Sequence, residues 1–206
     1  SFYRSLGSEV TLVEAADRVL PNEDHEICAL AQRAFERRGM RVHTGTAVES
    51  LRFGDDGVTA TLRGPGGTSE ARVERVISAV GIEANAEDLG LEGTGVKLDR
   101  GHVVVGPWLE TGEPGVYAIG DLTAPPWLAH KASHEAAICV EKIAGLAHVA
   151  PLDTHRIPAC TYAHPQVASI GLTEQKARQR GVAVRTGSFP FAANGKAIAM
   201  RQDEGL

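Results

Sequence analysis

Glu14 is the first residue of this sequence whose position suggests chemistry. It ends an apolar, β-branched run at residues 9–14, which is typical of a buried parallel strand. In a dinucleotide-binding βαβ unit, a carboxylate at such a strand end accepts hydrogen bonds from the adenosine ribose hydroxyls and repels a 2′-phosphate, which favours NAD over NADP. The GxGxxG loop of such a unit is absent, so a solvated acid at a strand end is an equally good interpretation.

Cysteine and histidine side chains form no comparable pattern. The three cysteines, Cys28, Cys139 and Cys160, are far apart and form no CxxC pair, so we expect buried reduced thiols rather than a disulfide or a metal centre. His130 and His134 lie close together, but no second cluster of ligands accompanies them. We therefore predict no metal site.

The overall composition is that of a globular chain. A length of 206 residues, with 43% hydrophobic and 23% charged residues, allows one or two domains. The net charge of −5 and the scattered Lys and Arg residues give no support for a nucleic-acid or anionic membrane partner. No apolar run approaches the ~20 residues that span a bilayer, and no signal-peptide pattern is present, so we expect a cytoplasmic protein. Both ends read as interrupted, and we expect a piece of a longer chain.

Several elements must position Glu14. Residues 2–6 are expected to end a helix, with Gly7 as its stop. Residues 24–38 predict an amphipathic helix, with Asp24 as its N-cap and Gly39 after its end. Short strands are expected at residues 41–43, 47–53, 58–63 and 71–73, joined by glycine-containing turns. A further apolar strand at residues 75–80 should end at Gly81.

The second half of the chain begins with a loop-rich region that contains a weak strand at residues 102–105. Residues 115–119 predict a buried strand that stops at Gly120, and residues 128–146 predict a long helix. Beyond them, residues 157–170 alternate like a strand, residues 173–180 predict a short helix capped by Thr173, and residues 182–191 predict another strand. This last block indicates the start of an α+β unit.

Six segments, taken in order, resemble the dihydrolipoyl dehydrogenases. They are GSEVTLVEAADRVLP (7–21), AVG (79–81), GVYAIGD (115–121), PPWLAHKASHE (125–135), IPACTYAHPQVASIGLTE (157–174) and FPFAANGKAIA (189–199). The resemblance covers essentially the whole chain. GVYAIGD alone is shared with glutathione and mercuric reductases, whereas WLAHKA and FPFAANGKA together indicate the lipoamide enzymes.

The resemblance implies sites for FAD and NAD. At the FAD site, Gly120 would allow close approach of the ligand, and Asp121 would accept a hydrogen bond from a ribityl hydroxyl. The loop before the long helix would bring the helix N-terminus to the flavin pyrimidine edge, where it favours negative charge. At the NAD site, Val48 is equally well interpreted as a strand core residue, and Ile82-Glu83-Ala84 depart from the common pattern after Gly81. The expected cofactor-binding residues are Glu14, Val48, Gly81, Gly120, Asp121, Trp127, Leu128, Ala129 and His130.

The resemblance also implies an α/β fold that is part of a flavoprotein with two dinucleotide-binding domains, followed by the start of an α+β dimerisation domain. Residues 1–83 would be the later part of the NAD-binding domain, residues 84–152 the returning part of the FAD-binding domain, and residues 153–206 the start of the dimerisation domain. The whole protein would be a homodimer that oxidises the dihydrolipoyl domain of a 2-oxo acid dehydrogenase complex. Electrons would pass through a disulfide and FAD to NAD.

The catalytic groups of the resembled enzymes are absent from this chain. It has no CxxxxC pair for thiol–disulfide exchange and no His–Glu acid–base pair. His164-Pro165 lacks a Glu at the required distance, and we interpret it as structural. We therefore predict no catalytic residue and no activity for this chain alone. Two alternatives stay open: a mercuric or glutathione reductase-like enzyme, whose NADP-dependent members Glu14 disfavours, and a truncated partner-binding protein without catalysis.

Overall fold

The structure is a computed structural model that describes residues 1–206. It divides into two compact units. Residues 1–78 and 160–206 together form the first unit, and residues 79–159 form the second. The first unit is therefore built from two segments that the second unit separates in sequence.

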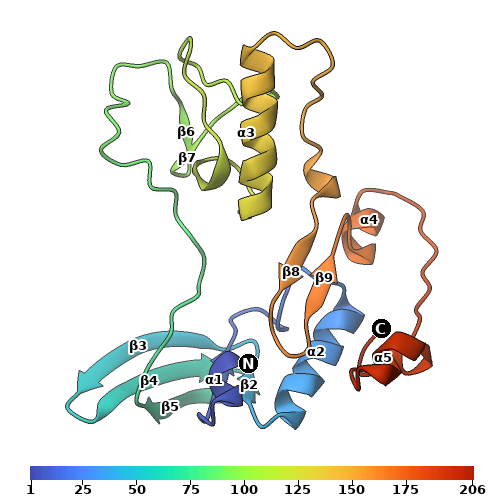
Figure 1. Ribbon diagram of the computed structural model, residues 1–206. Helices are drawn as coiled ribbons and strands as arrows, with labels where there is room; N and C mark the ends of the chain where they lie inside the picture. The colour runs from blue at the N-terminus through green and yellow to red at the C-terminus, as the bar shows by residue number, and fades with distance from the viewer. The chain divides into compact units, whose positions relative to one another are not determined.

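A strand–helix–strand arrangement opens the first unit (Figure 1). β1 (Thr11–Val13) pairs in parallel with β2 (Arg41–His43), and α2 (His25–Arg37) connects them. Gly39 adopts a φ of +82° after the helix. The Gly39 and Met40 N–H groups donate to the Glu36 and Phe35 carbonyls at 2.8 and 3.1 Å, which ends the helix as predicted. The chain then returns beside β1, as a dinucleotide-binding unit requires.

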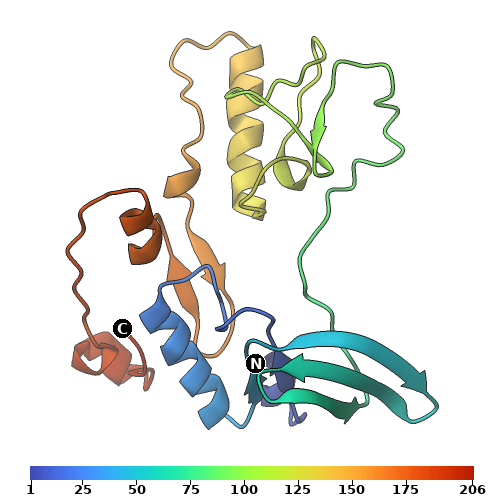
Figure 2. The same cartoon turned by 180° about the vertical axis from the view of Figure 1, so that it is seen from behind.

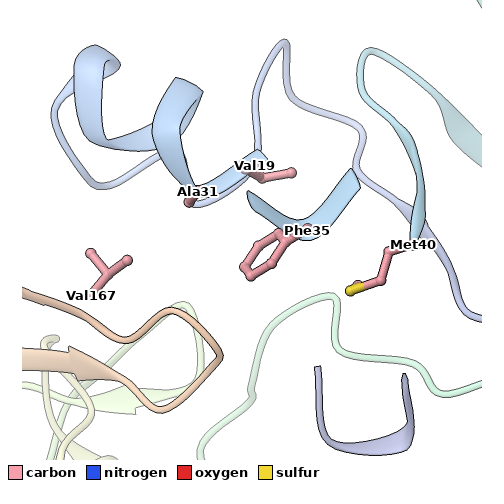
Figure 3. Packing of buried hydrophobic residues seen from close by; sticks show 5 residues of the cluster. All are labelled: Val19, Ala31, Phe35, Met40 and Val167. Carbon is pink, nitrogen blue, oxygen red and sulfur yellow. The ribbon is translucent and has the colours of Figure 1, made fainter. Parts of the chain in front are cut away.

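Five buried apolar residues form the core of the first unit: Val19, Ala31, Phe35, Met40 and Val167 (Figure 3). Ala31 and Phe35 come from the apolar face of α2, which the four-residue spacing predicts. Val167 comes from β9 (Val167–Ser169), which pairs with β8 (Ala159–Thr161). The second segment of the unit thus completes a core that the first segment begins.

Three antiparallel strands form the predicted meander, seen from both sides in Figure 1 and Figure 2. They are β3 (Ala47–Gly54), β4 (Gly57–Gly64) and β5 (Gly67–Val73), in the order β3-β4-β5. The central strand buries every second residue, namely Val58, Ala60 and Leu62, which is the period of a half-buried strand. β5 begins four residues earlier than the predicted strand at 71–73.

The second unit contains one long helix and several short elements. These are β6 (Leu98–Asp99), β7 (His102–Val103), η1 (Gly120–Leu122), α3 (Ala129–Ile143) and η2 (Thr154–Arg156). The prediction of a long helix after the Pro-containing loop is confirmed by α3. No helix of the chain is both long and apolar enough to cross a bilayer.

Three predicted strands are wrong. Residues 75–80 form no strand, and the side chain of Val80 is 96% exposed. Residues 115–119 make only an isolated bridge between Tyr117 and Glu110, and residues 182–191 run largely as exposed irregular chain. Their apolar composition suits a strand, but a strand also needs neighbours for its backbone groups, and no strand of this chain lies beside them.

Short helices complete the first unit: α1 (Phe2–Ser5), α4 (Glu174–Gln179), η3 (Phe191–Ala193) and α5 (Gly195–Ala199). Thr173 caps α4 as predicted, since its Oγ1 accepts a hydrogen bond from the Lys176 N–H at 3.2 Å. Asp24 occupies the N-cap position of α2, but its side chain makes no hydrogen bond to that helix. It accepts instead from the Glu174 N–H at 2.8 Å, because the first turn of α4 lies within its reach.

Candidate functional site

A tight turn, η1, carries two residues predicted to contact a flavin. Gly120 is buried with a φ of +73°, and a Cβ atom there would lie 3.3 Å from the Cβ of Ala132. This conformation and this close packing both favour glycine. Asp121 follows it and is exposed, so its carboxylate is available to accept a hydrogen bond from a ligand.

Two buried charged side chains hold this turn against α3. Glu135 Oε2 accepts a hydrogen bond from the Gly120 N–H at 2.7 Å, and Glu135 Oε1 lies 2.8 Å from Lys131 Nζ. Lys131 Nζ also donates to Thr123 Oγ1 at 3.1 Å. Buried charges are tolerated when they are paired and hydrogen-bonded. Sequence reasoning missed this pair, although its i,i+4 spacing on one helix was a usable signal.

The loop before α3 is fixed by Trp127. Its indole Nε1 donates to the Thr123 carbonyl at 3.0 Å. Its ring stacks on the imidazole of His102 in β7, with ring centroids 5.0 Å apart and an interplanar angle of 18°. His130, in the first turn of α3, places Nε2 2.8 Å from the Pro158 carbonyl oxygen. Both ends of the loop are therefore attached to other parts of the second unit.

The N-terminus of α3 is open. Leu128 is the N-cap residue, provides no side-chain cap, and no acidic residue lies in the first turn. The Ala132 N–H donates to the Leu128 carbonyl at 3.1 Å, so the N–H groups of Ala129, His130 and Lys131 precede the intrahelical ladder. Together with the helix dipole they favour a negatively charged ligand group.

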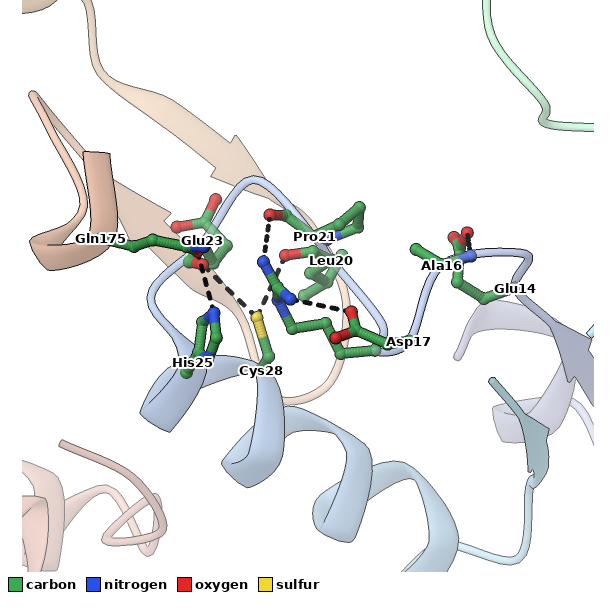
Figure 4. A network of polar contacts seen from close by, with 10 residues as sticks. Glu14, Ala16, Asp17, Leu20, Pro21, Glu23, His25, Cys28 and Gln175 are labelled. Atoms are coloured by element: carbon green, nitrogen blue, oxygen red, sulfur yellow. Dashed lines mark hydrogen bonds and ion pairs between the residues drawn. The ribbon is translucent and has the colours of Figure 1, made fainter. Parts of the chain in front are cut away.

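Glu14 lies in the first unit, directly after β1 (Figure 4). Its N–H donates to the His43 carbonyl at 2.8 Å, and its Oε1 accepts from the Ala16 N–H at 2.8 Å. Its carbonyl accepts from the N–H of Thr46, which lies in the loop after β2, at 3.0 Å. The carboxylate is thus held at the carboxyl end of two parallel strands, where dinucleotides bind in open α/β sheets.

Val48 and Gly81 are less closely tied to a site. Val48 follows Thr46 in the sequence, pairs with Leu62 in the meander and is 47% exposed, so it is not a buried core residue. Gly81 has a φ of +130° with open space around it. In summary of position alone, Gly120, Asp121 and the 127–130 loop lie together in the second unit, and Glu14 and Val48 lie in the first.

The cysteines do not form a reactive centre. Cys28 and Cys139 are buried and Cys160 is exposed. Burial raises the pKa of the Cys28 thiol, although the Arg18 guanidinium partly offsets the effect. Burial also raises the pKa of Cys139, and the Glu110 carboxylate adds to the increase. No group of three or more His, Cys, Asp or Glu side chains is arranged to hold a metal ion.

Comparison with known sequences decides the family. The sequence model for the pyridine nucleotide-disulphide oxidoreductases matches residues 1–136, which is well over half of the chain. The chain belongs to the pyridine nucleotide-disulphide oxidoreductase family. The model for the dimerisation domain of the same family matches residues 157–206. FAD and NAD, the two cofactors expected from the sequence, are those that this family uses.

Curated relatives from this oxidoreductase family include dihydrolipoyl dehydrogenases. The chain is 50% identical over 207 residues to that of Rhizobium etli and 50% identical over 207 residues to that of Zymomonas mobilis. These alignments cover 100% of the chain but only 43% and 44% of the relatives. The chain therefore spans less than half the length of these relatives, and the resemblance to dihydrolipoyl dehydrogenases is confirmed.

Solved structures of the oxidoreductase family give the same fold. LpdA from Mycobacterium tuberculosis matches with a TM-score of 0.86 and 29% identity, over 98% of this chain and 44% of that one. The flavoprotein disulfide reductase RclA from Escherichia coli matches with a TM-score of 0.89 and 24% identity, over 100% of this chain and 46% of that one. The predicted α/β fold class, with the start of a dimerisation domain, is confirmed.

Proposed function

We propose that the protein carrying this chain is a dihydrolipoyl dehydrogenase that binds FAD and NAD. One observation supports the proposal most strongly. Within the second unit, Gly120 of the turn before Asp121 is hydrogen-bonded to Glu135 of the helix whose N-terminus is open. A carboxylate for a hydroxyl and a row of N–H groups for a negative edge are thus fixed to one another. The 50% identity to enzymes of this name favours them over other reductases of the family.

The residues present fit the flavin. Gly120 leaves room that a Cβ would fill, and Asp121 is positioned to accept a hydrogen bond from a ribityl hydroxyl. The N–H groups of Ala129 and His130 point along the helix axis toward a ligand at its N-terminus, with Trp127 and Leu128 leading into it. Bound FAD would supply a two-electron relay between thiols and NAD. The open helix end would stabilise its reduced, anionic form.

The residues of the first unit suit the adenosine half of NAD. We place the Glu14 carboxylate on the ribose hydroxyls, because the Ala16 N–H holds it at the strand end. A 2′-phosphate would meet a like charge there, so NAD is preferred to NADP. We place Val48 and Gly81 along the same cofactor, since both are open to a ligand.

The proposed reaction is balanced by the two substrates. A dihydrolipoyl dithiol loses two electrons and two protons as its ring disulfide forms, and NAD⁺ takes up a hydride while one proton is released. We propose that the CxxxxC disulfide and the His–Glu pair lie in the remaining part of the polypeptide. The partner would be the dihydrolipoyl domain of a 2-oxo acid dehydrogenase complex, the active protein a homodimer, and its location the cytoplasm.

The test is an assay on the complete polypeptide that contains this chain. We expect it to be yellow with bound flavin and to reduce NAD⁺ with dihydrolipoamide. Reduction of glutathione disulfide or of Hg(II) by NADPH, without activity on dihydrolipoamide, would reject the proposal in favour of those reductases. A complete polypeptide that carries no flavin and has none of these activities would favour a partner-binding protein.

A further inference from the structure

The buried pair Lys131 and Glu135 reaches both ends of the turn that carries Asp121. Glu135 accepts from the N–H of Gly120, the first residue of η1, at 2.7 Å. Lys131 donates to the hydroxyl of Thr123, the residue that follows η1, at 3.1 Å. Each end of the three-residue turn is therefore held by one side chain from α3.

The hydrogen bonds around this turn form a closed ring. Thr123 Oγ1 accepts from Lys131 and donates to the Gly120 carbonyl at 2.8 Å. Lys131 is paired with Glu135 at 2.8 Å, and Glu135 returns to the Gly120 N–H. The side chains of Lys131, Glu135 and Thr123 are 2–5% exposed. Because every polar group in the ring has a partner, one position of the turn satisfies all of them.

We propose that Lys131, Glu135 and Thr123, which we name the α3 clamp, set the position of Asp121 relative to the N-terminus of α3. The clamp thereby tunes the affinity for FAD and the reduction potential of the bound flavin. The inference rests on the proposed function, because it assigns Asp121 and the helix end to one flavin. The three residues are positioning residues, since they act through the turn.

Packing alone does not account for charged residues at these places. A buried ion pair is often no more stabilising than apolar side chains of similar volume. Apolar side chains would leave the Gly120 N–H without an acceptor and the Thr123 hydroxyl without a donor. What the charged pair adds is a fixed register between turn and helix. Lys131 joins the two flavin contacts most directly, since its own N–H belongs to the open helix end.

A pair of variants at Thr123, made in the complete holoprotein, tests the clamp. Thr123→Val keeps the shape of the side chain but removes the hydroxyl, whereas Thr123→Ser keeps the hydroxyl. We expect Thr123→Val to weaken FAD binding about tenfold, the effect of one lost buried hydrogen bond, and to shift the flavin reduction potential. Thr123→Ser should stay within about twofold of the wild type. Ser133→Ala is the matched control, because Ser133 bonds the Ala129 carbonyl on the exposed side of the same helix.

The readouts are the dissociation constant of FAD from the apoprotein and the potential measured by spectroelectrochemistry. A Thr123→Val protein that is less thermostable but keeps the wild-type affinity and potential would overturn the inference and make the ring purely structural. If Thr123→Val does not fold, the double variant Lys131→Met/Glu135→Leu serves instead, with the same expected losses. A complete wild-type polypeptide that never binds FAD would reject the proposed function itself, whereas flavin binding that no variant alters rejects only the clamp.

Discussion

The carboxylate of Asp24 accepts a hydrogen bond from the backbone N–H of Glu174, 2.8 Å away and 150 residues later in the sequence. Asp24 stands at the start of α2, and Glu174 is the first residue of α4. Beside this bond, His25 Nε2 lies 2.9 Å from Gln175 Oε1, and Ser169 donates to Glu23 at 3.2 Å. A polar seam thus joins the two segments of the first unit above their shared apolar core.

Asp24→Ala should weaken this seam. Loss of a carboxylate that caps a helix N-terminus typically lowers the free energy of unfolding by about 1–2 kcal/mol. Asp24→Asn should retain most of the stability, because its amide oxygen also accepts from the Glu174 N–H. The measurement is denaturant unfolding of the complete protein, with hydrogen exchange of peptides covering α4. Asp17→Ala is the control, since the Asp17 side chain is 78% exposed and pairs only with the adjacent Arg18. Unchanged exchange in α4 would contradict the prediction.

Two phenylalanines allow a matched comparison of burial. Phe35 is 5% exposed in the core and Phe53 is 76% exposed at the end of β3. Phe35→Ala should lower the free energy of unfolding by about 3–5 kcal/mol through lost transfer energy and a cavity. Phe53→Ala should change it by less than about 0.5 kcal/mol. Equal losses in denaturant unfolding would show that the core is assigned incorrectly.

Glu14→Lys tests the nucleotide preference. Replacing the carboxylate by a cation removes an acceptor for the ribose hydroxyls and offers a partner to a 2′-phosphate. We expect the ratio of kcat/KM for NAD over NADP to fall by at least about tenfold. Glu9→Lys is the control, because Glu9 is 83% exposed at the other end of the same strand region and pairs with Arg41. A similar fall in both variants would indicate a general charge effect rather than ribose contact.

The stability of the first unit should depend on pH through Cys28. Its thiol donates to the Leu20 carbonyl at 3.2 Å (Figure 4), and burial raises its pKa in the folded state. The unfolded thiol titrates at about 8.5. A raised folded pKa gives a contribution that is complete below the unfolded pKa and is lost as pH rises through the folded pKa.

The free energy of unfolding should therefore decline above about pH 8.5, and Cys28→Ala should make that decline shallower. Denaturant unfolding at increasing pH measures both slopes. In the folded protein at neutral pH, the Cys28 peptide should also resist alkylation, because the thiolate is the reactive form. Rapid alkylation of Cys28 without unfolding would contradict its burial.

The parts of the fold that sequence predicts are those specified locally. The stripe that includes Ala31 and Phe35 predicts α2, Gly39 predicts its end, and Thr173 predicts the start of α4; all three are confirmed. The strands expected at 75–80, 115–119 and 182–191 are wrong, because strand composition does not reveal whether another strand lies alongside. The same limit explains Asp24, whose capping partner is 150 residues away.

The candidate site shows a similar division. The glycine at position 120 is predictable, since its motif requires a turn without a side chain, and the structure gives it a φ of +73° and close packing on Ala132. The α3 clamp is not predictable from composition, because Lys and Glu are almost never fully buried. Their i,i+4 spacing suggests a pair, but only the fold reveals that the pair faces the Gly120 turn.

The division of the first unit into two segments has a consequence for synthesis on the ribosome. Translation proceeds at roughly 5–20 residues per second, so α2 emerges on the order of 10 s before α4, which follows 150 residues later. During that interval Phe35 lacks Val167, its core neighbour from the second segment. The apolar face of α2 is then exposed on the nascent chain and is a surface for a chaperone to hold until residues 160–206 arrive.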